Sequence, residues 1–135
     1  MNAKLISIEE LKFRGAQSGS GDPEVYDDGH LRVEHSNYYV SLQGRALKLP
    51  RTEFLIVSRL ARNPERFVEA EELWRSAWGM TKPLNHESLH VHIYRLRNKL
   101  TPHGIRIETM INVGYRLLPA SSVQRRERDP ADSAS

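Results

Sequence analysis

His86, Glu87 and His90 form the pattern H-E-x-x-H, which supports zinc chemistry when it lies on a helix. The spacing puts two imidazoles on one helix face with a carboxylate beside them. A zinc hydrolase also needs a third protein ligand, commonly a histidine six residues further on, and Leu96 stands there. A catalytic zinc site is therefore disfavoured. Adventitious metal binding by the two histidines and ordinary solvent-facing histidines remain as alternatives.

Other catalytic chemistries find little support in this chain. There is no cysteine, which excludes disulfides, thiolate metal sites and cysteine nucleophiles. We find no glycine-rich phosphate loop and no convincing nucleophile constellation. We therefore expect no enzymatic activity, no cofactor and no resident metal.

Positive charge is concentrated in one part of the 135 residues. The net charge is +3, but residues 73–118 alone carry seven Lys or Arg against two Asp or Glu, which gives +5. The same segment holds four of the six histidines. Such a segment is a candidate surface for a polyanion, although short basic helices that are simply solvated would show the same charge.

The chain is long enough for one folded domain with two extended ends. Residues 1–23 are expected to be a flexible leader, in which a capping-box pattern from Ser7 to Glu10 is compatible with a short helix before a Gly/Ser-rich linker. Residues 24–119 should form the folded domain, and the polar residues 120–135 a disordered tail. No segment is apolar enough to cross a membrane, and the cytoplasm is the expected location.

The domain begins with alternating apolar and polar residues and continues with helical spacing. Turn residues separate four short runs that predict an antiparallel meander: Val25-Tyr26, Leu31–Val33, Tyr38–Leu42 and Arg45–Leu49. Helices are predicted at about 51–62, after Pro50, at about 69–78, and from an Asn85 cap to Leu100. Strands at 105–110 and 115–118 complete a hairpin. This order predicts an α+β fold, a winged helix-turn-helix with an N-terminal antiparallel β-meander, three helices and a C-terminal β-hairpin wing.

The third predicted helix has an apolar side and a polar side. At about 100° per residue, Leu89, Ile93, Leu96 and Leu100 form a buried stripe. Opposite them lie Glu87, Ser88, Val91, Tyr94, Arg95 and Asn98. A helix of this kind fits the major groove of DNA, where Arg95 would bind guanine and Val91 a thymine methyl group. His92, Arg97 and Lys99, on the flanks, are expected at phosphates, although cations near a helix C-terminus also answer the helix dipole.

Four motifs resemble the C-terminal effector domain of OmpR/PhoB-type response regulators. They are Leu47-x-Leu49-x-x-x-Glu53-Phe54, Leu73-x-x-x-x-Trp78-Gly79, Val91-His92-Ile93-x-x-Leu96-Arg97-x-Lys99-Leu100 and Thr109-x-x-x-x-Gly114-Tyr115-Arg116. The resemblance covers about residues 31–118. It implies sequence-specific DNA binding by the third helix, a wing in the adjacent minor groove and, often, tandem binding to direct repeats. By position it assigns DNA contacts to Val91, His92, Tyr94, Arg95 and Arg97, and either a phosphate contact or a packing role to Trp78.

The sequence also departs from that family. Glu87 and His90 stand where members commonly have an arginine and a carboxylate, so one expected phosphate contact becomes a repulsion. Ile111-Asn112 stand where the wing often has Arg-Gly; Asn112 tolerates a positive φ, but Ile111 does not replace an arginine in a minor groove. The residues before position 31 are too few for a phosphoacceptor receiver domain. The sequence thus predicts a stand-alone effector or a truncated chain, and the initial methionine favours the former.

We therefore expect a transcriptional regulator that binds specific double-stranded DNA and lacks its own receiver. The expected contact residues are Trp78, Ser88, Val91, His92, Tyr94, Arg95, Arg97, Asn98, Lys99 and Asn112. The alternative is a winged-helix protein-interaction module that binds RNA polymerase, through the 79–85 loop, or another regulator. A second copy of the chain on direct repeats is a further expected partner.

Overall fold

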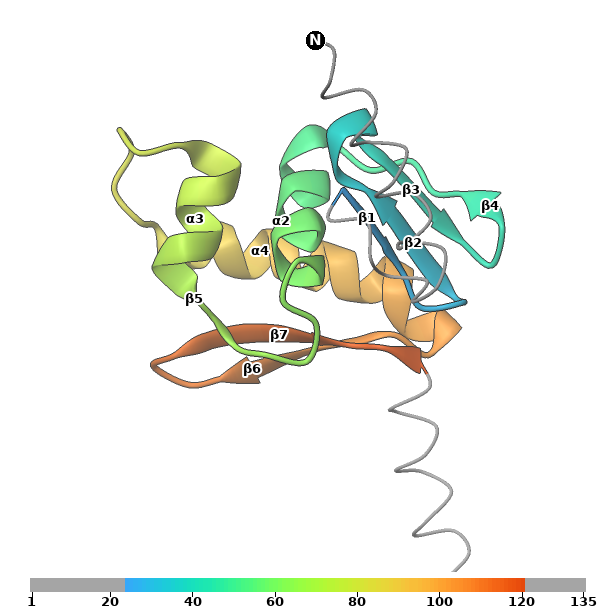
Figure 1. The fold of residues 1–135 in the computed structure, drawn as a ribbon. Coiled ribbons are helices and arrows are strands. Elements are labelled where there is room, and N and C mark those ends of the chain that lie inside the picture. Colours follow the sequence, from blue (N-terminus) through green and yellow to red (C-terminus); the bar gives the residue numbers. More distant parts are fainter. Residues whose placement is uncertain (1–23, 121–135) are drawn as a thin grey trace, which may run out of the picture. The chain divides into compact units, whose positions relative to one another are not determined.

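The computed structural model describes residues 24–120 (Figure 1). The predicted leader helix and linker and the predicted tail from residue 121 onward lie outside the described residues. The sequence predicts that the tail begins at Ala120, but Ala120 is described and buried. The chain divides into two compact units, Met1–Leu47 and Lys48–Ser135. Together their elements confirm the predicted α+β winged helix-turn-helix fold.

The N-terminal unit is a four-stranded antiparallel meander. Its strands are β1 (Val25–Asp27), β2 (Leu31–Glu34), β3 (Tyr39–Leu42) and β4 (Arg45–Ala46), paired in chain order. A single 3-10 turn, His35–Asn37, joins β2 to β3. The meander was predicted, but its last strand ends at Ala46 rather than Leu49. Only Arg45 and Ala46 are paired with β3 in register, although the Leu47 amide still donates to the Val40 carbonyl at 2.8 Å.

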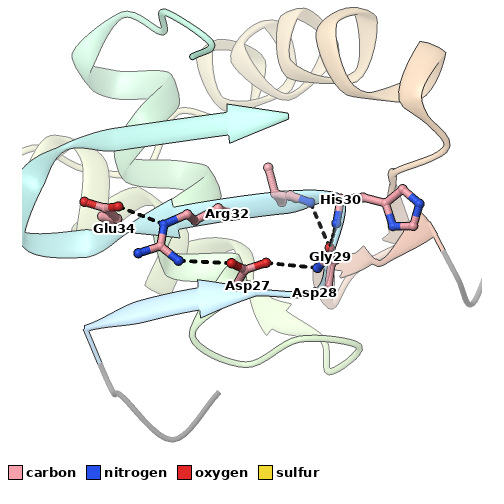
Figure 2. Close-up of polar contacts among 7 residues, drawn as sticks. Asp27, Asp28, Gly29, His30, Arg32 and Glu34 are labelled. Carbon is pink, nitrogen blue, oxygen red and sulfur yellow. Dashed lines mark hydrogen bonds and ion pairs between the residues drawn. The ribbon is translucent and has the colours of Figure 1, made fainter. Parts of the chain in front are cut away.

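Carboxylate side chains define the turn between β1 and β2 (Figure 2). Asp27 Oδ1 accepts a hydrogen bond from the Gly29 amide at 2.9 Å, and Gly29 has a φ of 93°, which glycine adopts without strain. Arg32 bridges Asp27 and Glu34, at 3.0 and 2.8 Å. Hydrogen bonds from Asn37 and Arg32 hold the pKa of Glu34 below its usual value. Asp27 and Glu34 thus form their hydrogen bonds and ion pairs within the meander.

The second unit holds the three predicted helices. They are α2 (Arg51–Ala61), α3 (Ala70–Trp78) and α4 (His86–Leu100). Pro50 precedes α2 with a φ of −56°, as the sequence predicts for a helix start, and its carbonyl accepts a hydrogen bond from the Phe54 amide at 2.9 Å. Gly79 ends α3 at a φ of 93°. A 3-10 turn, Thr101–His103, follows α4.

A three-stranded antiparallel sheet completes this unit (Figure 1). It contains β5 (Val68–Glu69), β6 (Arg106–Met110) and β7 (Gly114–Leu118), in the order β5-β7-β6. The hairpin was predicted, whereas β5 was not. Gly114 permits its pairing, because a Cβ at that position would lie 1.9 Å from the Val68 carbonyl oxygen. Strand β5 ends at Glu69, and α3 begins at the next residue.

The core of the second unit consists of aliphatic side chains from all three helices and the hairpin. Fully buried members include Ile56, Leu60, Leu73, Leu89, Ile93, Leu96, Leu100, Ile105 and Leu117. Burial of this area stabilises the unit and fixes the rotation of each helix about its axis. None of the helices between residues 24 and 120 is long and apolar enough to span a membrane.

Candidate nucleic-acid interface

Helix α4 begins where its capping residue predicts. The Asn85 side chain accepts a hydrogen bond from the Ser88 amide at 3.0 Å, which satisfies one of the unpaired donors of the first turn. The four apolar residues of the predicted stripe, Leu89, Ile93, Leu96 and Leu100, are all fully buried. The orientation of α4 is therefore the one predicted from its periodicity.

The opposite side of α4 is open to solvent. We call the residues Glu87, Val91, Tyr94, Arg95 and Asn98 the exposed face of α4, because each is exposed. Tyr94 retains 62% and Val91 41% of its accessible surface. The exposed face thus combines a carboxylate, an aliphatic group, a phenol, a guanidinium and an amide. Such a mixture can hydrogen-bond base edges as well as contact a thymine methyl group.

Aromatic side chains support one flank of α4. Trp74 and Trp78 stack with their ring centroids 4.0 Å apart, and His92 meets the Trp78 ring edge-on at 5.0 Å. Trp74 Nε1 donates to the Lys82 carbonyl at 2.8 Å, which anchors the loop between α3 and α4. Trp78 and His92 are both half-buried. Trp78 therefore has a packing role, one of the two roles that the sequence predicted for it, and it remains partly accessible.

The His92 ring is oriented by its own helix. Its Nδ1 lies 2.7 Å from the Ser88 carbonyl oxygen, and because a carbonyl only accepts, Nδ1 carries the proton. Nε2 makes no hydrogen bond to another residue between 24 and 120. Ser88 is half-buried and lies one helical turn before His92, so its hydroxyl and the imidazole share one flank of α4. This flank can offer polar groups to a ligand beside the exposed face.

Arg97 is bonded within the protein, although its place on the flank of α4 predicts a phosphate contact. Its Nε donates to the Ile107 carbonyl at 2.9 Å and its Nη2 to the Thr109 hydroxyl at 2.5 Å. Both acceptors belong to β6. Arg97 therefore ties α4 to the wing hairpin, a role that the helical periodicity alone does not reveal.

Lys99 is also engaged. Its Nζ lies 2.6 Å from Oε1 of Glu53, a residue of α2 that is only 1% exposed. The ion pair compensates a carboxylate that would otherwise be buried without a partner. The expected phosphate contact of Lys99 competes with this bond. Sequence reasoning missed this ion pair. The signal for it was Glu53, an acid among apolar positions at the start of α2.

The wing has an apolar tip. The turn between β6 and β7 exposes Met110, Ile111 and Val113, with Ile111 80% accessible. Asn112 has a φ of 66°, as predicted for a residue that replaces glycine there. A groove lies between this turn and the first turns of α4, and the His90 and Tyr115 rings line it with their centroids 5.9 Å apart. The wing tip therefore lies beside the first turns of α4.

Charges on the hairpin are partly neutralised. Arg116 pairs with Glu108 at 2.8 Å and lies 4.6 Å over the Phe67 ring. Arg106 is exposed and has no ion pair with any residue from 24 to 120. Burial raises the pKa of the Tyr115 hydroxyl, with Arg97 opposing the shift, so Tyr115 is protonated at neutral pH. The cations best placed to reach an outside ligand are therefore fewer than the sequence count suggests.

Among residues 24–120, no third metal ligand lies beside His86 and His90. Within residues 24–120, no group of three or more His, Asp or Glu side chains is arranged to hold a metal ion. In the described structure the H-E-x-x-H pattern thus contributes exposed polar side chains at the start of α4.

Comparison with known proteins identifies the family. The family described as "Transcriptional regulatory protein, C terminal" matches residues 44–117. The chain belongs to this family. Its members include the DNA-binding domains of OmpR/PhoB-type response regulators, and the family is one of transcription factor domains rather than enzymes.

Two solved structures of the family have the same fold. The DNA-binding domain of CpxR from E. coli is 26% identical with a TM-score of 0.61, and the match covers 71% of this chain and 97% of that one. The Klebsiella pneumoniae RstA DNA-binding domain, solved in complex with the RstA box, is 28% identical with a TM-score of 0.61, over 71% and 98% of the two chains.

Curated relatives are response regulators. The response regulator ArlR of Staphylococcus haemolyticus is 29% identical over 116 residues, which are 83% of this chain and 53% of the relative. The transcriptional regulatory protein VxrB of Vibrio cholerae is 30% identical over 115 residues, 85% of this chain and 46% of the relative. The chain therefore spans about half the length of these relatives.

Proposed function

We propose that this protein binds specific double-stranded DNA by inserting the exposed face of α4 into the major groove, and that it regulates transcription in this way. The exposed face is the observation that carries the proposal. Four side chains of different hydrogen-bonding character and one valine share one side of a helix whose other side is fully buried. Val91 and Tyr94 are exposed beside Arg95, so an apolar group, a phenol and a guanidinium are together available to a groove.

Base contacts are assigned to four residues of the exposed face. Arg95 offers a bidentate fork to guanine, and Asn98 is suited to adenine. Val91 contacts a thymine methyl group, and Tyr94 packs its ring along the groove wall. These pairings use the donors and acceptors that distinguish base pairs in the major groove.

Backbone contacts are assigned to the flank and the wing. The Trp78 indole, His92 Nε2 and the Ser88 hydroxyl are polar groups beside the exposed face and suit phosphate oxygens. Asn112 at the wing tip is assigned to the adjacent minor groove. Arg97 and Lys99 act mainly by holding α4 against β6 and α2, so their effect on DNA binding is indirect.

Selection from a randomised duplex library tests this function. The full chain should enrich one sequence motif, and the enriched duplex should bind more tightly than a scrambled duplex of equal composition. Methylation or substitution at guanine N7 within the motif should weaken binding if Arg95 occupies the major groove. Failure to enrich any motif would refute sequence-specific binding.

A second function is favoured by one observation. Met80 is 81% exposed in the loop between α3 and α4, and the indole of Trp74 anchors that loop at Lys82. A fixed loop with an exposed apolar side chain suits a protein partner such as RNA polymerase. Met80→Ser should then reduce transcription activation in a reconstituted assay while duplex affinity stays the same. Unchanged activation would remove this candidate.

A further inference from the structure

Glu87 lies on the centre line of the exposed face of α4. At about 100° per residue, Val91 and Asn98 are within roughly 40° of Glu87 around the helix axis, and the buried stripe lies on the opposite side. In a helix that enters a groove, the central row faces the base edges, whereas the flanks face the two phosphate backbones. Glu87 is therefore in a base-facing row and in the first turn of the helix.

This carboxylate has no partner in the described structure. No hydrogen bond or ion pair joins Glu87 to another residue from 24 to 120, and the side chain is exposed. Some other acids of the same unit are neutralised, since Glu53 pairs with Lys99 and Glu72 pairs with Arg75 at 3.0 Å. An unpaired negative charge on the centre line repels a polyanion unless the groove supplies a donor.

The major groove supplies such a donor at only two bases. Cytosine presents its N4 amino group and adenine its N6 amino group, whereas guanine and thymine present acceptors to this groove. A carboxylate only accepts hydrogen bonds. At adenine, the N7 lone pair beside the amino group repels the second carboxylate oxygen. Cytosine N4 has a C–H group beside it instead, so cytosine is the base that suits Glu87 best.

We infer that Glu87 is a specificity determinant that accepts a hydrogen bond from cytosine N4 at one position of the binding site. The inference rests on the proposed function. Glu87 penalises guanine and thymine most at that position, because the charge is then desolvated next to acceptors, and adenine less, because adenine N7 lies beside its amino donor. It thereby lowers non-specific affinity and raises the ratio of specific to non-specific binding.

Library selection with variants tests this role. The wild-type chain should enrich a motif with cytosine at one position, and Glu87→Ala should lose the preference at that position alone, with discrimination falling about tenfold. Glu87→Gln should shift the preference toward adenine, because an amide pairs with adenine N6 and N7. Affinity for mixed-sequence duplex should rise several-fold in both variants.

Glu71 provides a matched control. It is an exposed acid in the first turn of α3 and has no ion pair among the described residues. Glu71→Gln removes the same charge from a comparable position, so it should leave the base profile unchanged at every position. This control separates base recognition from a general loss of negative charge.

The outcomes distinguish this inference from the proposed function. A wild-type motif whose base profile is identical in Glu87→Ala would overturn the inference and leave DNA binding intact. Loss of preference at several positions at once would also overturn it, because Glu87 would then act on helix structure. Failure of the wild-type chain to enrich any sequence would refute the proposed function itself.

Discussion

Replacement of Lys99 by methionine separates a structural role from a phosphate-binding role. Lys99→Met keeps the length of the side chain but leaves the Glu53 carboxylate, 1% exposed, without its cation 2.6 Å away. Loss of one partner from a buried pair costs about 3–5 kcal/mol. The Lys99 side chain is 34% exposed, so water can partly replace it, and we expect a loss of about 2 kcal/mol. For a domain of this size that lowers Tm by about 8–16 °C.

A double-mutant cycle provides the assay. Thermal and urea unfolding of Lys99→Met, Glu53→Gln and the double variant should give a coupling free energy of about 1–2 kcal/mol, with the double variant more stable than Lys99→Met. At a temperature where all variants are folded, duplex affinity and its salt dependence should change little. A Tm within about 2 °C of wild type, together with a tenfold loss of affinity, would refute this reasoning and restore Lys99 as a phosphate contact.

Three further substitutions test the remaining assignments. Arg95→Ala should cost about 1–3 kcal/mol on the selected duplex and little on scrambled DNA, and equal losses on both would make Arg95 a backbone contact. Arg97→Gln should lower the free energy of urea unfolding by about 1–2 kcal/mol and accelerate amide exchange in β6, because it removes the hydrogen bonds to Ile107 and Thr109. Unchanged amide exchange would show that Arg97 does not hold β6 against α4. Ile111→Arg should raise affinity for A·T-rich flanks and steepen the salt slope by about 0.9, whereas an unchanged slope would place the wing tip away from the groove.

Local sequence signals predicted the elements that depend on them. Asn85 at the start of α4 and the stripe from Leu89 to Leu100 follow from capping and helical periodicity, and both were confirmed. The positive φ of Asn112 likewise follows from the tolerance of asparagine for that conformation. These features involve residues close together in the chain, so the sequence carries the information directly.

Features that depend on distant residues were not predictable in the same way. Strand β5 has only two residues. Its pairing with β7 depends on Gly114, which lies 45 residues after Glu69 in the sequence. The partner of Lys99 is 46 residues away, and Arg97 bonds to residues of the next strand. A helical wheel gives the direction of a side chain but not what packs beside it. The sequence therefore predicted the buried side of α4, but it did not reveal that Arg97 and Lys99 are bonded within the protein.

The most direct test of the central claim compares two duplexes over a range of salt. Within residues 79–118, which hold α4, the loop before it and the wing hairpin, the exposed cations without an ion pair to a described residue are Lys82, Arg95 and Arg106, so about two to three phosphates should be neutralised. We predict that the selected duplex binds about a thousandfold more tightly than a scrambled duplex at about 0.15 M salt, with log K falling against log salt at a slope of about −2 to −3. Equal affinity for both duplexes at every salt concentration would contradict sequence-specific binding by the exposed face of α4.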